Sequence, residues 1–317
     1  MIEATRLTRA GKLAEAAALL RGLLGGARPA ADPPAPPEPS GGSSTGQFLD
    51  RKSGSLDYKL YVPSGLAPGA PLLVMLHGCT QSPEDFAAGT QMNVPAEARG
   101  ILVAYPAQSR NANPQKCWNW FSPPHQQRGQ GEPAAIAAMT RELIAEYGVD
   151  PKRVFVAGLS AGGAAAAVMG EAYPDLFAGV GVHSGLAAGS ARDVTSALAA
   201  RKRGGMGTRG AAATPVPTIT FHGDRDMTVH EGNAGEVVAR AAAAAGPLHT
   251  TTQTGTSAGG RSFTRSISRD AKGRGVIEQW TVHGSGHAWS GGSNAGSYTD
   301  PAGPDASAEM LRFFMAL

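Results

Sequence analysis

The chain has 317 residues, enough for one large α/β domain or two small ones with a sizeable core. Hydrophobic residues make up 42%, charged residues 17%, and the net charge is +3, which is typical of a globular, weakly charged protein. We expect no nucleic-acid partner, because a phosphate-binding surface needs clustered Lys and Arg. The one basic cluster, "ARKRGG" at Ala200–Gly205, is predicted to be a solvated surface loop.

The N-terminal segment, residues 1–24, is predicted to form an amphipathic helix. Its apolar residues recur at helical spacing: Ala10, Leu13, Ala17, Leu20 and Leu24. We expect this helix to dock on the main body or on a sister chain, which makes it a candidate homo-oligomer contact. Its interspersed charges argue against a secretory signal, and no segment approaches the roughly 20 apolar residues of a membrane span. The printed sequence therefore predicts a cytoplasmic location, unless it is a trimmed part of a longer chain.

Two further regions follow the helix. Residues 25–46 are rich in Pro, Gly and Ser, which predicts a linker without a core. From residue 47 to 317, predicted strands and helices alternate, which indicates a single α/β domain that we expect to be the catalytic domain. Inside it, residues 187–215 are longer than a tight connection requires, so we expect either a small lid or a surface excursion.

The strands of this domain are predicted from short apolar runs that end in glycine or turn residues. They are Leu56–Pro63, Pro71–Gly78, Gly100–Pro106, Arg153–Leu159, Ala178–Gly185, Pro217–Gly223 and Val276–Gly284. The first alternates polar and apolar residues, as an edge or half-exposed strand does. The predicted helices are Glu132–Tyr147, Ala161–Tyr173, Glu231–Ala245 and Asp305–Ala316. Near-continuous apolar strands predict a mostly parallel, doubly wound sheet with flanking helices.

One predicted strand ends in a pattern that favours a nucleophile. The segment "VFVAGLSAGG", Val154–Gly163, places Ser160 in a G-x-S-x-G pattern between an apolar strand and an Ala-rich helix. The glycines fit a strand-to-helix turn too tight for larger side chains, and the helix that follows aims its free N–H groups at developing negative charge. A glycine-rich turn with an incidental serine is the structural alternative.

A serine nucleophile needs a base, and the base needs a carboxylate, in the chain order Ser, acid, His. Two aspartates compete in "FHGDRDMTV": we favour Asp226, which lies past the strand end, over Asp224. For the base we favour His287, in a glycine-rich loop, over His283 at the strand end.

Three more histidines, His77, His183 and His222, also lie at strand ends. We expect these three to bond to nearby turn backbone rather than to take part in catalysis.

The oxyanion must be held by two backbone N–H groups. One is expected from Ala161, the residue after the nucleophile. The other is expected from Cys79, in the sharp turn after the "LLVMLHG" strand, with Thr80 as its nearest competitor. The resulting acyl transfer needs no metal or organic cofactor.

With these motifs in place, the chain resembles the poly(3-hydroxybutyrate) depolymerase-type esterases of the α/β-hydrolase superfamily. The matching stretches are "LHGCTQSPEDFA", "CWNWF", "DPKRVFVAGLSAGG", "FHGDRDMTV" and "GSGHAWSGG". The resemblance implies an α/β-hydrolase fold and serine-dependent ester hydrolysis with Ser160, Asp226 and His287 as the triad.

The resemblance also suggests a disulfide between Cys79 and Cys117, with two buried thiols as the alternative. Such a disulfide would place the protein outside the cytoplasm, because reducing compartments oppose it. Trp118, Trp120 and Trp289 resemble an aromatic wall around the ester. We favour Trp118 and Trp289 as the substrate-binding residues of this wall.

The substrate class is open among esters. We expect short 3-hydroxyalkanoate oligomers or polyester, with soluble oligomers favoured over solid polymer because no substrate-binding module is evident. Feruloyl or acetyl esters of plant material are the alternative within the same family. An alternative of another class is a catalytically silent hydrolase-fold binding protein, which would be expected to carry a broken triad.

Overall fold

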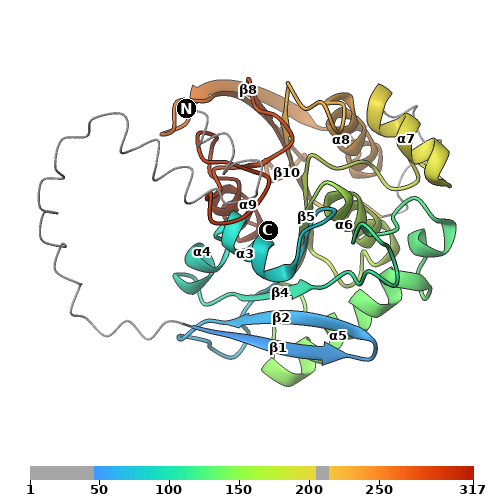
Figure 1. Cartoon of the computed structure of the whole chain (residues 1–317). Coiled ribbons are helices and arrows are strands. Elements are labelled where there is room, and N and C mark those ends of the chain that lie inside the picture. Colours follow the sequence, from blue (N-terminus) through green and yellow to red (C-terminus); the bar gives the residue numbers. More distant parts are fainter. Residues whose placement is uncertain (1–45, 205–213) are drawn as a thin grey trace, which may run out of the picture. The chain divides into compact units, whose positions relative to one another are not determined.

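The computed structural model describes residues 46–204 and 214–317. The predicted N-terminal helix and nearly all of the predicted linker lie outside this range. The described chain is built on a ten-stranded sheet, whose strands lie in the order β1-β2-β4-β3-β5-β6-β7-β10-β9-β8 (Figure 1). Their bounds are β1 Gln47–Ser53, β2 Leu56–Val62, β3 Leu72–Leu76, β4 Leu102–Pro106, β5 Val154–Leu159, β6 Gly179–His183, β7 Thr218–Gly223, β8 His249–Thr256, β9 Ser262–Arg269 and β10 Gly275–Val282.

The centre of the sheet is parallel and its edges are antiparallel. Strands β4, β3, β5, β6, β7 and β10 pair in parallel, whereas β1 and β2 on one side and β9 and β8 on the other pair antiparallel. The central strands are apolar throughout because both of their faces are covered; every residue of β3 and of β5 is buried. The mostly parallel α/β sheet predicted from the sequence is confirmed.

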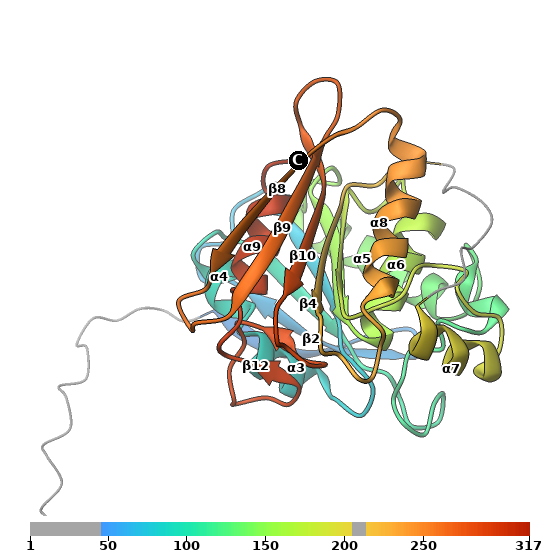
Figure 2. The ribbon, with the colours of Figure 1, turned by 90° about the horizontal axis from the view of Figure 1, so that it is seen from above.

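Helices cover both faces of this sheet, and each face has its own core (Figure 2). One layer contains α5 (Gly131–Tyr147), α6 (Ala161–Ala172) and α8 (Gly232–Ala245), packed on strand residues such as Val74 and Val156. The other contains α3 (Pro83–Thr90), α4 (Asn93–Glu97) and α9 (Ala306–Phe314), packed on Leu73 and Phe155. Neighbouring residues of one strand thus serve opposite cores. No helix within the described ranges is long and apolar enough to cross a membrane.

Four smaller elements complete the described chain. They are the 3₁₀ helix η1 (Pro123–Gln126), α7 (Val194–Arg203) and the short paired strands β11 (Trp289–Ser290) and β12 (Thr299–Asp300). The prediction of a solvated loop at "ARKRGG" is wrong, because residues 201–203 form the last turn of α7. Positive charges at this end of a helix interact favourably with its dipole. The stretch 187–215 therefore contains a helix, and its action as a lid stays a prediction.

Strands β1, β8 and β9 were not predicted from the sequence. The burial of β8, "HTTTQTGT", explains this, because seven of its eight residues are exposed and none supplies an apolar face. Such a strand is held by pairing to β9 and by cross-strand hydroxyl bonds, as between Thr250 and Ser268, rather than by a core. Because β1 occupies the edge, β2 is a half-exposed strand one position inside it.

Candidate active site

Ser160 lies in a strained turn between β5 and α6. Its backbone has φ 58° and ψ −117°, a conformation that L-residues rarely adopt and that is typical of functional sites. A Cβ on Gly158 would overlap the backbone of Gly162, and a Cβ on Gly162 would overlap the carbonyl oxygen of Leu76. Both glycines of the pattern are therefore required by close backbone approach. The Ser160 N–H donates to the carbonyl of His183 at 2.9 Å, which ties the turn to β6.

Asp226 and His287 come together from two loops at the carboxyl ends of neighbouring strands. Asp226 follows β7 and His287 follows β10, which pair in parallel. The Nδ1 atom of His287 lies 2.6 Å from Oδ2 of Asp226, whose side chain is fully buried. The other carboxylate oxygen accepts the backbone N–H groups of Thr228 and Val229, both at 2.8 Å.

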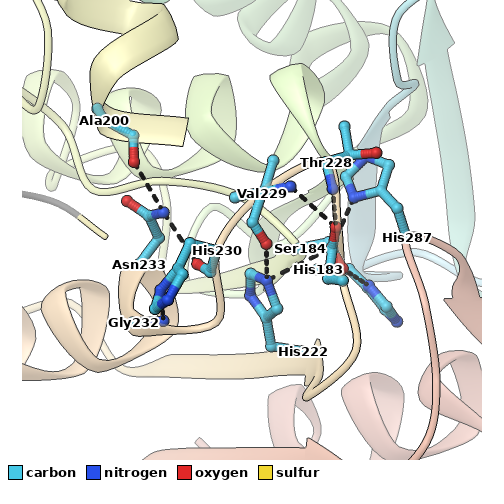
Figure 3. Close-up of polar contacts among 11 residues, drawn as sticks. His183, Ser184, Ala200, His222, Thr228, Val229, His230, Gly232, Asn233 and His287 are labelled. Atoms are coloured by element: carbon cyan, nitrogen blue, oxygen red, sulfur yellow. Dashed lines mark hydrogen bonds and ion pairs between the residues drawn. The ribbon is translucent and has the colours of Figure 1, made fainter. Parts of the chain in front are cut away.

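The environment of Asp226 keeps this carboxyl ionised. Burial alone would raise its pKa, but hydrogen bonds from His222 and His287 outweigh burial and hold the pKa well below the ordinary value. An ionised Asp226 can only accept hydrogen bonds, so Nδ1 of His287 carries a hydrogen and donates a hydrogen bond to Asp226. In the neutral ring, Nε2 of His287 is then an acceptor, as a general base requires. Figure 3 shows His222 and His287 reaching the loop of Thr228 and Val229 from different elements.

The two competing residues form a separate pair. Nδ1 of His283 lies 2.9 Å from Oδ2 of Asp224, and its Nε2 lies 2.8 Å from Oγ1 of Thr264. Asp224 also accepts the backbone N–H of Gly284 at 2.7 Å. Both nitrogens of His283 are thus engaged between β7, β9 and β10, and this pair does not line the cavity described below. It is placed to join strand ends rather than to serve Ser160.

The turn after β3 lies against the nucleophile. A Cβ built on Gly78 would come within 3.6 Å of Cβ of Ser160. The N–H of Thr80 donates to the carbonyl of Gln115 at 2.6 Å and is thereby occupied, which leaves Cys79 as the donor of this pair. Ala161 is the first residue of α6, so the helix offers its N–H no acceptor. The role of Cys79 and Ala161 as oxyanion donors stays a prediction.

A disulfide joins Cys79 to Cys117, as predicted. The bond closes a sequence separation of 38 residues and ties the turn after β3 to the "CWNWF" segment. Both cysteines line the cavity beside Ser160. The disulfide therefore fixes the backbone from which one oxyanion donor is expected.

These elements surround a cavity of about 400 Å³, a size typical of small-molecule sites. Ser160 and His287 both line it, and most of its wall is apolar. The lining residues are Gly78, Cys79, Thr80, Gln115, Cys117, Trp120, Phe121, Leu159, Ser160, Ala161, Leu186, Val194, Ala197, Leu198, Arg201, Thr228, Val229, His287 and Tyr298.

The prediction that Trp118 and Trp289 bind substrate is wrong in this structure. Trp118 is completely buried and Trp289 nearly so, and neither lines the cavity. Their indole N–H groups are satisfied internally, by the His77 carbonyl and by Oγ of Ser307, both at 3.1 Å. Trp120, which the sequence places in the same aromatic group, is the tryptophan on the cavity wall. Residue order alone does not say which of two tryptophans in "CWNWF" faces inward.

The remaining strand-end histidines bond to backbone groups, as the sequence interpretation expects. Nδ1 of His77 lies 2.7 Å from the Gly78 carbonyl, and Nε2 of His183 accepts the Ser290 N–H at 2.9 Å. Nε2 of His222 lies 2.8 Å from the carbonyl of Val229. Burial lowers the pKa of His77 to about 4 and that of His183 well below its ordinary value, so both rings are neutral.

Comparison with known proteins places these features in a family. Residues 56–259 match the family described as esterase PHB depolymerase. The chain is 35% identical over 246 residues to poly(3-hydroxyalkanoate) depolymerase C of Paucimonas lemoignei, which covers 74% of this chain and 58% of that protein. It is 35% identical over 143 residues to acetylxylan esterase A of Talaromyces purpureogenus, covering 45% of this chain and 36% of that protein.

A third relative is feruloyl esterase B of Thermothelomyces thermophilus, 33% identical over 139 residues, covering 44% of this chain and 47% of that protein. The chain thus spans between about a third and three fifths of these relatives' own lengths. Among solved structures, acetyl xylan esterase from Aspergillus awamori matches with a TM-score of 0.68 at 22% identity, over 86% of this chain and 100% of that one. This likeness confirms the α/β-hydrolase fold.

Proposed function

The chain belongs to the esterase PHB depolymerase family, and from that premise we propose that it is a serine carboxylic-ester hydrolase that works through an acyl-enzyme. Its proposed substrates are short 3-hydroxyalkanoate oligomers or polyester. The observation that carries the proposal is the 2.6 Å contact of Asp226 with His287, a histidine that lines the same cavity as Ser160. The likeness to a poly(3-hydroxyalkanoate) depolymerase supports the substrate class.

In the first step, Oγ of Ser160 attacks the ester carbonyl carbon while Nε2 of His287 takes the hydroxyl proton. The ionised Asp226 stabilises the imidazolium that forms. The tetrahedral oxyanion is held by the N–H groups of Cys79 and Ala161, each worth about 10²–10³ in rate. His287 then gives its proton to the departing alkoxide, so that the alcohol leaves and the acyl group stays on Ser160.

In the second step, a water molecule loses a proton to His287 and attacks the acyl carbon. The same two N–H groups hold the second oxyanion. The carbon–oxygen bond to Ser160 then breaks, His287 returns the proton to the serine, and the carboxylic acid is released. Chain, substrate and water account for every proton and bond, so the proposal includes no metal or organic cofactor.

Feruloyl or acetyl esters are the second candidate substrates. The aromatic side chains of Trp120 and Phe121 on the cavity wall favour a phenolic ring, since aromatic pairs gain from stacked or edge contacts. The experiment compares hydrolysis of a soluble 3-hydroxybutyrate oligomer with that of methyl ferulate, with Ser160→Ala as the control. Preference for the oligomer supports the first substrate class, and preference for the ferulate assigns the same triad to aromatic esters.

A catalytically silent binding protein is the alternative of another class. It would bind an ester in the cavity and leave it intact. A fluorophosphonate probe separates the two, because only an activated serine reacts with it. Labelling of the wild type that is absent in Ser160→Ala supports the esterase, whereas an unlabelled wild type supports the binding protein.

An oxidising compartment outside the cytoplasm is part of the proposal. The Cys79–Cys117 disulfide supports it, since cytosolic thiols are kept reduced in most organisms. Rapid alkylation of intact cells followed by mass spectrometry of both cysteines tests this, and free thiols in vivo would contradict it. The homo-oligomer contact through residues 1–24 lies outside the described chain and stays a prediction.

A further inference from the structure

Helix α7 presents one face to the cavity, and that face ends in a positive charge. Val194, Ala197, Leu198 and Arg201 all line the cavity, and their spacing of three, four and seven residues places them on one side of a helix. The first three are apolar. Arg201 is the one Asp, Glu, Lys or Arg among the lining residues of the described chain. Among the described residues, the cavity is therefore a mostly apolar space with one Arg side chain and no Lys, Asp or Glu.

The end of α7 that carries Arg201 is fixed in place. The amide nitrogen of Asn233, a completely buried residue, donates to the carbonyl of Ala200 at 3.1 Å and to that of His230 at 2.9 Å. The N–H of His230 donates to the carbonyl of Arg201 at 2.7 Å. Figure 3 shows Asn233 placed between Ala200 and His230. These bonds tie the last turn of α7 to the first turn of α8 and to the loop between Asp226 and α8.

The opposite end of α7 is also fixed. The Asp193 carboxylate accepts the N–H of Ser196 at 2.7 Å, and the Ser196 hydroxyl accepts the N–H of Asp193 at 3.1 Å, which forms a capping box. With both ends of α7 held, the backbone that carries Arg201 has a defined position on the cavity wall. Sites built on rigid elements recognise charged groups with the least loss of side-chain entropy.

We propose that Arg201 binds a free carboxylate of the ester substrate, so that the enzyme prefers esters carrying a carboxylate near the scissile bond. A guanidinium offers a planar fork of donors that matches a carboxylate with two parallel hydrogen bonds. Such a pair is stronger beside apolar walls than in water. This inference rests on the proposed esterase function and narrows its substrate class to anionic esters.

Short oligomers of hydroxy acids have this chemistry. Each ends in a free carboxylate only a few bonds from its last ester carbonyl. A second source of the same chemistry is an ester of an acidic sugar. In both kinds of substrate, the carboxylate belongs to the alcohol part of the ester. A neutral ester such as methyl ferulate lacks the group and would leave the guanidinium without its partner.

The competing explanation of Arg201 is structural. Cationic residues in the last turn of a helix stabilise its dipole, and Arg201, Lys202 and Arg203 all stand there. Of these three, only Arg201 lines the cavity, and Arg203 is exposed. Arg203→Gln thus removes the same charge from the same turn without touching the site, and it is the matched control for Arg201→Gln.

The test uses two pairs of substrates, and in each pair one member carries a carboxylate that a neutral group replaces in the other. One pair is the dimer of 3-hydroxybutyrate and its terminal primary amide, which adds no second ester bond. The other is the feruloyl ester of a uronic acid and that of the matching neutral sugar. In Arg201→Gln we expect kcat/KM for at least one anionic member to fall by about 10- to 100-fold, chiefly through KM, while its neutral partner changes by less than about twofold. In each pair, Arg203→Gln should leave the ratio of kcat/KM between the anionic and the neutral member unchanged. Arg201→Lys should restore part of the preference for the anionic member.

The outcomes are distinguishable. A loss confined to the hydroxy-acid pair identifies a hydroxy-acid oligomer as the source of the carboxylate, and a loss confined to the sugar pair identifies an acidic saccharide. Equal effects of Arg201→Gln on charged and neutral partners, or the same effect from Arg203→Gln, would overturn the proposal.

A binding measurement keeps the inference separate from catalysis and from folding of the Arg201 variants. Ser160→Ala should bind the anionic dimer more tightly than its terminal primary amide in calorimetry, with a preference that falls as salt rises. Equal binding overturns the carboxylate site even if the wild type hydrolyses both. If the wild type hydrolyses neither while Ser160→Ala keeps the preference, the esterase proposal fails and the carboxylate site stands.

Discussion

The carboxylate of Asp226 contacts Nδ1 of His287 at 2.6 Å, although the two residues lie 61 positions apart in the chain. The parallel pairing of β7 and β10 makes this contact, because it brings the two loops that follow these strands to one edge of the sheet. The loops after the same two strands hold a second Asp–His pair, in which Oδ2 of Asp224 lies 2.9 Å from Nδ1 of His283. The two pairs allow a direct comparison between a proposed catalytic role, for Asp226 and His287, and a proposed structural role, for Asp224 and His283.

Replacing Asp226 by Asn should lower kcat by about 10³–10⁴, because an amide in that position allows the wrong tautomer of His287. Asp224→Asn is the matched control, with the same change of charge and shape in the neighbouring pair, and should keep most of the activity. Steady-state hydrolysis of one soluble ester by both variants checks this. Equal losses in both, or a larger loss in Asp224→Asn, would transfer the acid role away from Asp226.

Stability should fall as the pH drops from about 6.5 to about 4 because of the buried ring of His77. Burial lowers the pKa of His77 to about 4, from an ordinary value near 6.5. The unfolded chain therefore takes up this proton at higher pH than the folded one. The contribution of the neutral ring is fully present above 6.5 and lost as the pH falls toward 4, by about 3 kcal/mol in all.

The measurement for His77 is the free energy of unfolding in urea at several pH values, compared between the wild type and His77→Gln. The free energy of unfolding of the wild type should fall by about 3 kcal/mol relative to that of His77→Gln as the pH drops through this window. A difference that stays constant with pH would show that His77 is not protonated on unfolding in this range.

Removing the disulfide in the double variant Cys79→Ala, Cys117→Ala should lower the free energy of unfolding by about 4 kcal/mol, as expected for a closed loop of 38 residues. Alanine keeps the N–H at position 79, so any additional loss of kcat reports movement of the turn rather than removal of a donor. Denaturant unfolding and kinetics under native conditions give the two quantities. Addition of a reductant should weaken the wild type and leave the double variant unchanged.

Trp118→Ala and Trp120→Ala should differ in kind. Trp118 is completely buried and bonded to His77, so its loss should cost about 3–5 kcal/mol in stability with little change in substrate preference. Trp120 lines the cavity, so its loss should change the ratio of kcat/KM between methyl ferulate and the oligomer. A changed ratio in Trp118→Ala alone would restore the original sequence prediction.

The central strands and the nucleophile turn could be predicted from the sequence because local pattern determines them. A strand buried on both faces, such as β5, must be apolar throughout, and the turn at Ser160 tolerates only glycine at 158 and 162. The proposed acid, Asp226, and the proposed base, His287, follow from chain order and from their position just beyond a strand end. The polar strand β8 could not be predicted from its sequence, because pairing with β9 rather than an apolar face of its own holds it in the sheet.

The cavity wall was the least predictable part. Whether Trp118 or Trp120 faces the cavity depends on how the "CWNWF" segment turns after the disulfide, and Arg201 reaches the cavity only because α7 forms and is tied down by Asn233. In the sequence alone, Arg201 belongs to a basic cluster with the composition of a solvated loop. Local composition does not predict which way a side chain points when tertiary contacts determine its direction.

The most direct measurement of the central claim is the site of covalent modification by a fluorophosphonate probe, mapped by mass spectrometry of peptides from the wild type, Ser160→Ala and Asp226→Asn. The proposed mechanism predicts one adduct, on Ser160, formed quickly in the wild type, slowly in Asp226→Asn and not at all in Ser160→Ala. A wild type that stays unlabelled while it hydrolyses esters, or an adduct that persists in Ser160→Ala, would contradict Ser160 as the nucleophile.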